Sequence, residues 1–163
     1  MQKRYAVAFT GPSGSGKTTL IEKIAIELIK SHKVAIIKHD PKDKAIFDVK
    51  GKDSYKFSQT GAEVIVASST KTTYLSQREK SLDEIINMLE DFDYLLVEGL
   101  KTLPLPRIVI FRNNIEESYF DYSEAMATDN SIKNIEIPNS IDILDLNNTQ
   151  DIISWIKTNA KEI

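Results

Sequence analysis

Short apolar runs, rich in β-branched residues, recur along the chain and predict strands buried in a core. The clear runs are Tyr5–Phe9, Val34–Ile37, Val64–Ala67, Tyr94–Val97 and Ile108–Phe111, and weaker ones are Ala125–Ala127 and Ile135–Ile137. Polar and turn-forming residues separate them, and each run is far too short to cross a lipid bilayer. The pattern therefore indicates a globular chain built on several short strands.

The stretch from Thr18 to Lys30 has the spacing of an amphipathic helix instead, because Leu20, Ile24 and Leu28 fall on one stripe. Strands that alternate with helices pair in parallel through right-handed crossovers, and the helices then cover both faces of the sheet. We therefore expect an α/β fold with a mostly parallel sheet, in a single domain spanning residues 1–163.

Capping signals predict two further helices. Ser81 and Glu84 have the spacing of a capping box. Thr149 is the expected N-cap of a final helix. The apolar residues of that helix are Ile152, Ile153, Trp155 and Ile156.

The segment from Asp40 to Gly61 departs from this regularity. Prolines, glycines and a dense mixture of Lys and Asp interrupt any steady period, which predicts a long, partly ordered loop. Loops of this length inside a compact domain are usually functional or mobile. A solvated surface insertion is the alternative interpretation.

Charge and composition narrow the possible functions. The chain has 163 residues, with 21 Lys plus Arg against 24 Asp plus Glu, so its net charge of -3 offers no broad positive field for nucleic acid or an anionic membrane. The absence of cysteine excludes disulfides, cysteine zinc sites, iron–sulfur clusters and thiol catalysis. The histidines are His32 and His39, too few for a histidine-rich metal site. We expect a cytoplasmic protein, since the first residues do not read as a signal peptide.

One motif carries most of the chemistry. Directly after the first predicted strand the chain reads Gly11, Pro12, Ser13, Gly14, Ser15, Gly16, Lys17, Thr18 and Thr19. This is G-x-x-x-x-G-K-[ST], and the amphipathic helix follows at once, as the phosphate-binding P-loop requires. The sequence therefore predicts the three-layer sandwich of a P-loop NTPase.

The residue types suit phosphate chemically. The glycines let the backbone turn tightly so that its N–H groups point inward, toward the positive end of the helix dipole. Lys17 would neutralise the β- and γ-phosphates, the Thr18 hydroxyl would bind Mg²⁺, and Thr19 could donate to the α-phosphate. The alternative is a glycine-rich turn that only caps the helix.

A magnesium site also needs an acid, normally at the end of a second buried strand. Asp93 precedes the Tyr94–Val97 run and Glu98 follows it. Glu98 is the better candidate, because ligands collect at the carboxyl ends of parallel strands. Asp40 is a further candidate metal or water-positioning acid, although it could equally start a turn before Pro41. We assign catalysis to Lys17, Glu98 and Asp40, and the metal to Thr18, Glu98 and Asp40.

Taken together, the motifs resemble the MobB-type GTP-binding proteins of molybdopterin-guanine dinucleotide biosynthesis, in the SIMIBI branch of P-loop GTPases. The resemblance covers nearly the whole chain. Its segments are Gly11–Thr19, Ile36–Asp40, Gly51–Tyr55 leading to Gly61–Ala62, Leu96–Lys101, Ile108–Arg112 and Ala125–Asp129.

This resemblance implies a homodimer that binds GTP with Mg²⁺, hydrolyses GTP slowly and assists the guanylyltransferase that attaches GMP to molybdopterin. Molybdopterin itself is a further candidate ligand. The segment from Lys38 to Ser54 would be a switch or substrate loop. Asp129 lies where a carboxylate could accept from the N1–H and amino groups of guanine, although the Asn-Lys-x-Asp motif is absent and a turn role is equally open.

One departure from the family concerns histidine. Family members often carry more histidines after the Lys-His pair, whereas this chain keeps only His39 there. His39 could contact substrate or be structural. Arg78, Arg107 and Arg112 are present, but the sequence identifies none as an arginine finger, so slow intrinsic turnover is expected.

Two other functions remain open at this point. A small-molecule kinase would use the same loop to hold ATP, although no Arg-rich lid is apparent. An interaction protein would use the nucleotide only to stabilise its fold. Base preference distinguishes the GTP-binding protein from the kinase, and turnover distinguishes both from the interaction protein.

Overall fold

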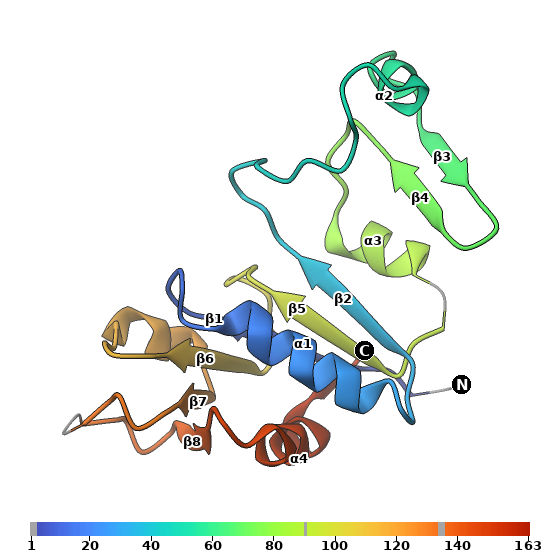
Figure 1. Cartoon of the computed structure of the whole chain (residues 1–163). Helices are drawn as coiled ribbons and strands as arrows, with labels where there is room; N and C mark the ends of the chain where they lie inside the picture. The colour runs from blue at the N-terminus through green and yellow to red at the C-terminus, as the bar shows by residue number, and fades with distance from the viewer. Residues whose placement is uncertain (1–2, 90, 134–135) are drawn as a thin grey trace. The chain divides into compact units, whose positions relative to one another are not determined.

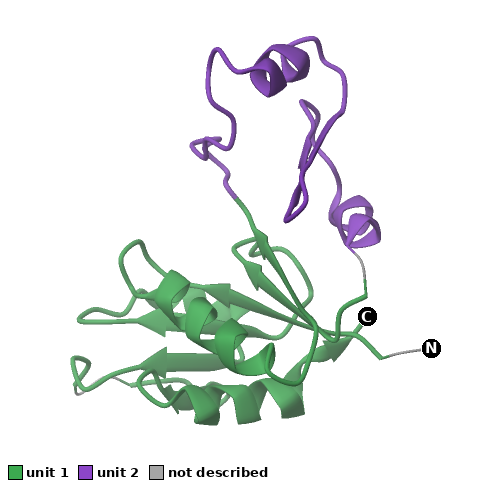
Figure 2. Cartoon of the chain, turned by 45° about the vertical axis from the view of Figure 1, so that its right-hand side comes forward, with its two compact units in different colours: residues 1–39, 91–163 green, residues 40–90 purple. Residues whose placement is uncertain are grey.

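The computed structural model describes residues 3–89, 91–133 and 136–163. It divides into two compact units, coloured separately in Figure 2. Unit 1 comprises residues 1–39 and 91–163, and unit 2 comprises residues 40–90. No helix in the described parts of the chain is long and apolar enough to span a membrane.

Unit 1 is built on a seven-stranded sheet with the order β2-β5-β1-β6-β7-β8, and β9 pairs with β1 (Figure 1). The strands are β1 (Tyr5–Thr10), β2 (Val34–Lys38), β5 (Tyr94–Glu98), β6 (Arg107–Phe111), β7 (Ala125–Thr128), β8 (Asp142–Asp145) and β9 (Lys161–Glu162). All pairs are parallel except β1 with β9. The expected α/β fold with a mostly parallel sheet is therefore confirmed.

The central strands of the sheet are the most buried part of unit 1. β1, β5, β6 and β7 consist almost entirely of buried residues, which is why they read as unbroken apolar runs. β2 lies at the edge, and its Ile36 is 49% exposed, so only part of the predicted Val34–Ile37 run is buried.

The two longest helices, α1 (Lys17–Leu28) and α4 (Thr149–Asn159), pack together on one face of this sheet (Figure 1). The predicted stripe of α1 is confirmed, since Leu20, Ile24 and Leu28 are all buried against the strands. The opposite face carries a 3-10 helix, η1 (Glu117–Tyr122), which packs through Tyr119 and Phe120 on a second apolar cluster.

Unit 2 contains the short helices α2 (Asp53–Ser58) and α3 (Leu82–Met88) and an antiparallel hairpin of β3 (Val64–Ala67) and β4 (Thr72–Leu75). The Ser81–Glu84 capping box at α3 is confirmed in both of its hydrogen bonds. The Asp40–Gly61 segment is loop interrupted by α2.

The expectation that Val64–Ala67 forms a buried strand is wrong on burial. Ile65 is 66% exposed and Val66 42% exposed, because β3 belongs to the isolated hairpin rather than to the central sheet. A short β-branched run has the same appearance in both settings, so periodicity could not separate them.

Two expectations near the end of the chain also need correction. Ile135 of the predicted Ile135–Ile137 strand lies outside the described residues, and Glu136 and Ile137 are not in a strand; the last parallel strand is β8 instead. The N-cap of α4 is Asn148, not Thr149. The Asn148 side chain accepts a hydrogen bond from the Asp151 N–H at 3.2 Å.

We expect Asn148→Ala to lower the free energy of unfolding by about 1 kcal/mol, because it leaves a first-turn amide without its cap. Thr149→Ala is the matched control and should change it by only a few tenths of a kcal/mol, roughly the difference in helix propensity. Urea unfolding followed by circular dichroism measures both. A larger loss in the Thr149 variant would contradict this assignment of the cap.

Candidate functional site

The glycine-rich loop, Gly11–Gly16, joins the buried strand β1 to α1. Gly11 has a φ of 139°, and a Cβ there would overlap the carbonyl oxygen of Ile110 on the neighbouring strand β6. Gly16 is in the left-handed region, with a φ of 97°. The loop therefore needs glycine both for its turn and for its close approach to β6.

The first turn of α1 has no side-chain cap within the described structure and no acidic residue, unlike the first turns of α3 and α4. Its amide groups lack intrahelical partners for geometric reasons. In the same loop, the Ser15 side chain is 4% exposed and its hydroxyl has no hydrogen-bond partner among the described residues. Uncapped amides and a hydroxyl without a partner in the described structure make this turn rich in hydrogen-bond donors, which suits an anion.

Lys17 begins α1, and its ammonium folds back over the loop. It donates to the carbonyl oxygens of Gly11 at 2.9 Å and Pro12 at 2.7 Å. Burial lowers the pKa of Lys17 from its ordinary value; Glu98 acts against this shift and Lys38 adds to it. An anion close to Lys17 would offset this effect of burial by favouring the charged form, so the electrostatics suit a negatively charged ligand. The Thr18 and Thr19 side chains are exposed beside it.

Glu98 ends β5, which pairs with β1 so that Glu98 lies opposite Phe9, near the start of the loop. Its carboxylate is 3.9 Å from the Lys38 ammonium. The next residue, Gly99, has a φ of 90° and lies close to His39, so the chain turns sharply there. Asp93, the rejected alternative, is at the opposite end of β5 and accepts from the Lys33 N–H at 2.7 Å.

Asp40 belongs to unit 2, where its carboxylate accepts from the N–H groups of Lys44 and Ala45, both at 2.7 Å. This is the turn role that the sequence left open. Among the described residues, no group of three or more Asp, Glu or His side chains gathers to hold a metal ion. The Thr18 hydroxyl and the Glu98 carboxylate in unit 1 do offer oxygen donors, the type that Mg²⁺ prefers.

Asp129 follows β7, and both of its carboxylate oxygens are engaged. Oδ1 accepts from the N–H of Ser131 at 3.0 Å and from its hydroxyl, while Oδ2 pairs with Arg112 Nε at 3.3 Å. The hydrogen bonds from the Ser131 hydroxyl and N–H, helped by Arg112, lower the pKa of Asp129 from its ordinary value. The role of Asp129 as a guanine reader stays a prediction.

The three arginines considered as arginine fingers make different contacts in the structure. Arg78 pairs with Glu63 inside unit 2. Arg107 is 2% exposed and donates to the carbonyl oxygens of Leu100, Leu103 and Tyr122, so it braces the chain that follows Gly99. Arg112 alone of these lies against the glycine-rich loop, beside Gly16. No local sequence signal marks this contact, because β6 and the loop are far apart along the chain.

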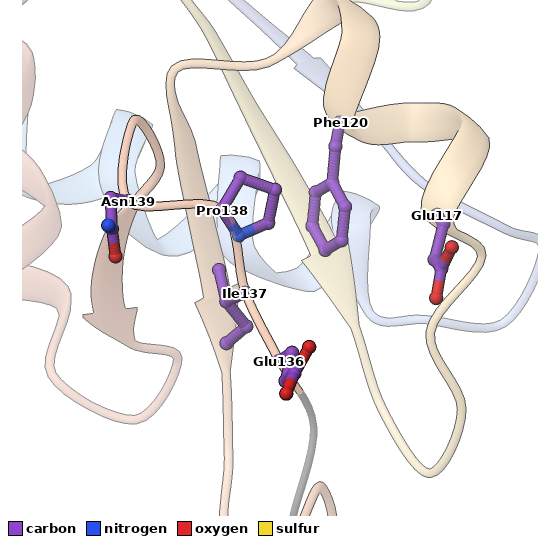
Figure 3. A pocket seen from close by; sticks show the side chains of 6 residues that line it. All are labelled: Glu117, Phe120, Glu136, Ile137, Pro138 and Asn139. Carbon is purple, nitrogen blue, oxygen red and sulfur yellow. The ribbon is translucent and has the colours of Figure 1, made fainter.

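A cavity of about 410 Å³ lies elsewhere in unit 1 (Figure 3). Phe120 of η1 and Pro138 line it, together with the acidic residues Glu117 and Glu136. None of the predicted site residues contributes to it, and its carboxylates would repel phosphate. The glycine-rich loop therefore remains the candidate site.

A mostly parallel sheet whose first strand runs through a glycine-rich loop into a helix defines the P-loop class of α/β proteins. The family model "Molybdopterin guanine dinucleotide synthesis protein B", MobB, matches residues 6–129. The chain belongs to the MobB family.

Individual relatives agree with this assignment. The chain is 32% identical over 157 residues to the molybdopterin-guanine dinucleotide biosynthesis adapter protein of Haemophilus influenzae, covering 93% of this chain and 86% of that protein. It is 34% identical to a putative adapter protein of the same name from Methanocaldococcus jannaschii, covering 80% of this chain but only 57% of the relative.

A solved structure of molybdopterin-guanine biosynthesis protein B is also similar. It superimposes with a TM-score of 0.73 at 25% identity, covering 94% of this chain and 98% of that one. The likeness thus extends over nearly all of both chains, in agreement with the family assignment.

We expect Ser131→Ala to raise the pKa of Asp129 toward its ordinary value of 3.8, because the largest stabilising hydrogen bond to the carboxylate is lost. In the wild type this pKa is depressed, so the stability it contributes is present above pH 3.8 and is lost as the pH falls through the folded-state pKa. Carbon-13 NMR titration of the Asp129 carboxyl measures the shift.

The control variant for this titration is Ser154→Ala on α4, whose hydroxyl donates to the Gln150 carbonyl instead. It should leave the pKa of Asp129 where it is. Equal titration curves for wild type and Ser131→Ala would contradict the proposed dependence on Ser131.

Proposed function

We propose that the chain, residues 1–163 acting as one P-loop nucleotide-binding domain, binds GTP with Mg²⁺ and hydrolyses it slowly. In this proposal it is a homodimeric adapter that assists the molybdenum cofactor guanylyltransferase in making molybdopterin-guanine dinucleotide. The observation that carries the proposal is the complete G-x-x-x-x-G-K-[ST] loop between β1 and α1. The names of the relatives, which are adapter proteins of this biosynthesis, support the pathway.

The loop would hold the phosphates through its backbone. Amides from Gly14 to Thr19 meet the phosphate oxygens at the positive end of α1. Lys17 already lies over the loop carbonyls, so a small movement of its ammonium replaces carbonyl oxygens by phosphate oxygens. The buried Ser15 hydroxyl is a further donor without a partner in the described chain.

The metal would be held by the Thr18 hydroxyl and the Glu98 carboxylate, with Asp40 as the predicted further acid. Bound Mg²⁺ would supply positive charge at the β- and γ-phosphates. The ammonium of Lys38 lies 3.9 Å from the Glu98 carboxylate. Glu98 lies opposite Phe9, at the end of β1 from which the loop leads to Thr18 in the first turn of α1.

Hydrolysis in this arrangement rests on position and charge rather than on a covalent step. Lys17 neutralises the phosphates, and Glu98 and Asp40 are the candidates for orienting a water molecule. Slow turnover is expected because the sequence identifies no arginine finger among Arg78, Arg107 and Arg112. A partner protein would supply what is missing.

Exposed apolar side chains in unit 2 support a role in association. Phe57 is 60% exposed and Ile65 66% exposed, so both side chains are accessible to another protein. A second subunit and the guanylyltransferase are the partners that the proposal names.

The first test is a titration of the purified protein with fluorescent GTP and ATP analogues, with and without Mg²⁺. We expect clear preference for GTP and tighter binding with Mg²⁺. Preference for ATP would favour a small-molecule kinase instead. Nucleotide binding without any turnover would favour an interaction protein whose nucleotide stabilises the fold.

Lys17→Ala provides the negative control for the same titration. Loss of a charged donor to phosphate should weaken binding roughly tenfold to hundredfold, the equivalent of about 1.5–3 kcal/mol. Lys23→Ala, an exposed lysine on α1, should bind like wild type. Unchanged affinity in the Lys17 variant would place the phosphates somewhere other than the glycine-rich loop.

Glu98→Gln should remove most of the gain in affinity that Mg²⁺ gives, while affinity without metal stays close to wild type. The reason is that the amide keeps the size of the side chain but loses the charge that holds the cation. Asp93→Asn, at the other end of β5, is the matched acid and should keep the Mg²⁺ effect. Equal losses with and without Mg²⁺ in Glu98→Gln would indicate a folding defect, and thermal unfolding measures that directly.

A further inference from the structure

Arg112 lies against the glycine-rich loop although it is nearly a hundred residues away along the chain. β6 pairs with β1 in parallel, with Thr10 opposite Val109, so the carboxyl end of β6 is beside the loop. A Cβ built on Gly16 would lie 3.6 Å from Arg112 Cζ and 3.8 Å from its Nη2. The guanidinium therefore lies beside Gly16, the residue immediately before α1.

The guanidinium is held there by Asp129. Arg112 Nε is 3.3 Å from Asp129 Oδ2, and Asp129 is in turn fixed through Oδ1 by the Ser131 N–H and hydroxyl. The Ser131 hydroxyl also accepts from the N–H of Asn113 at 2.8 Å, which ties the ends of β6 and β7 together.

The contact with Asp129 uses only the Nε group of the guanidinium. Within the described structure the terminal nitrogens of Arg112 make no hydrogen bond, and the side chain is 44% exposed. An arginine has five N–H donors in a planar fork. Most of them are left to face an external acceptor.

Arg112 and Glu98 lie on opposite sides of the glycine-rich loop. β1 lies between β5 and β6, so Glu98 with Lys38 stands on one side of the loop and Arg112 with Asp129 on the other. The flank that carries Glu98 suits a cation, whereas the Arg112 fork suits phosphate oxygens, which guanidinium groups bind in a bidentate manner.

We propose that Arg112 contacts the phosphate chain of a nucleotide bound in the glycine-rich loop, and that Asp129 is a positioning residue that aims the guanidinium. This inference rests on the proposed function, since it needs a nucleotide in that loop. It gives Asp129 a role different from reading guanine, because both oxygens of its carboxylate already have partners.

The two roles of Asp129 lead to different results for base preference. A guanine reader affects GTP and leaves ATP unchanged. A positioning residue for a phosphate-binding arginine affects GTP and ATP by the same factor, because the phosphates of the two nucleotides are identical.

The experiment is a fluorescence titration of wild type, Arg112→Ala, Arg112→Lys and Asp129→Asn with GTP and ATP analogues, at low and high salt. We expect Arg112→Ala to lose about tenfold in affinity for both nucleotides, with a smaller loss at high salt because charge is screened. Arg112→Lys should recover part of the loss. Asp129→Asn should lose less than Arg112→Ala and keep the GTP-to-ATP ratio of wild type.

The matched control is Arg4→Ala, which removes an ion-paired arginine just before β1, at the end of the strand away from the loop. Thermal unfolding of every variant identifies any loss that comes from misfolding. The Asp129→Asn and Arg112→Ala double variant should bind like Arg112→Ala alone, because the aspartate acts through the arginine.

Three results would overturn the inference. If Arg112→Ala binds both nucleotides as tightly as Arg4→Ala does, Arg112 does not contact the phosphates. If Asp129→Asn lowers the affinity for GTP but not for ATP, Asp129 recognises the guanine base. If the wild-type protein binds neither nucleotide, the proposed function is overturned as well. If the wild type binds tightly and only the variants behave differently from expectation, the inference alone fails.

Discussion

The close contact between Gly11 and β6 is the constraint on which the site depends. The backbone of the loop passes so near the Ile110 carbonyl that no side chain fits, and this contact directs the chain from the buried strand β1 into α1. β1 is the central strand of unit 1, with β5 on one side and β6 on the other. The carboxyl ends of all three strands therefore meet at the loop, and each contributes a charged side chain or a donor there.

Opposite charges are paired on each side of that loop. Glu98 is close to Lys38, and Asp129 is close to Arg112, so a basic side chain partly offsets the charge of each acid. Lys17 lies over the loop itself, with a pKa lowered by burial. A chain with a net charge of -3 can thus present a locally cationic surface, because the ends of neighbouring strands bring several basic side chains together at the loop.

Much of the sheet and the loop could be predicted from the sequence, and the reasons are local. Fully buried strands such as β5 are continuous apolar runs, and the loop motif has fixed spacing before α1. The exposure of Ile65 could not be predicted, because a β-branched run is the same in a hairpin as in a core. The contact of Arg112 with Gly16 depends on the order of strands in the sheet, which single-sequence patterns do not encode.

Unit 2 occupies the crossover between β2 and β5, two neighbouring parallel strands. Parallel pairing requires the chain to run from the carboxyl end of one strand back to the amino end of the next, but it sets no condition on what lies between. The hydrogen bonds of β2 with β5 are therefore indifferent to the length and sequence of residues 40–90. Evolution can remodel this insertion while the sheet of unit 1 keeps its strand order.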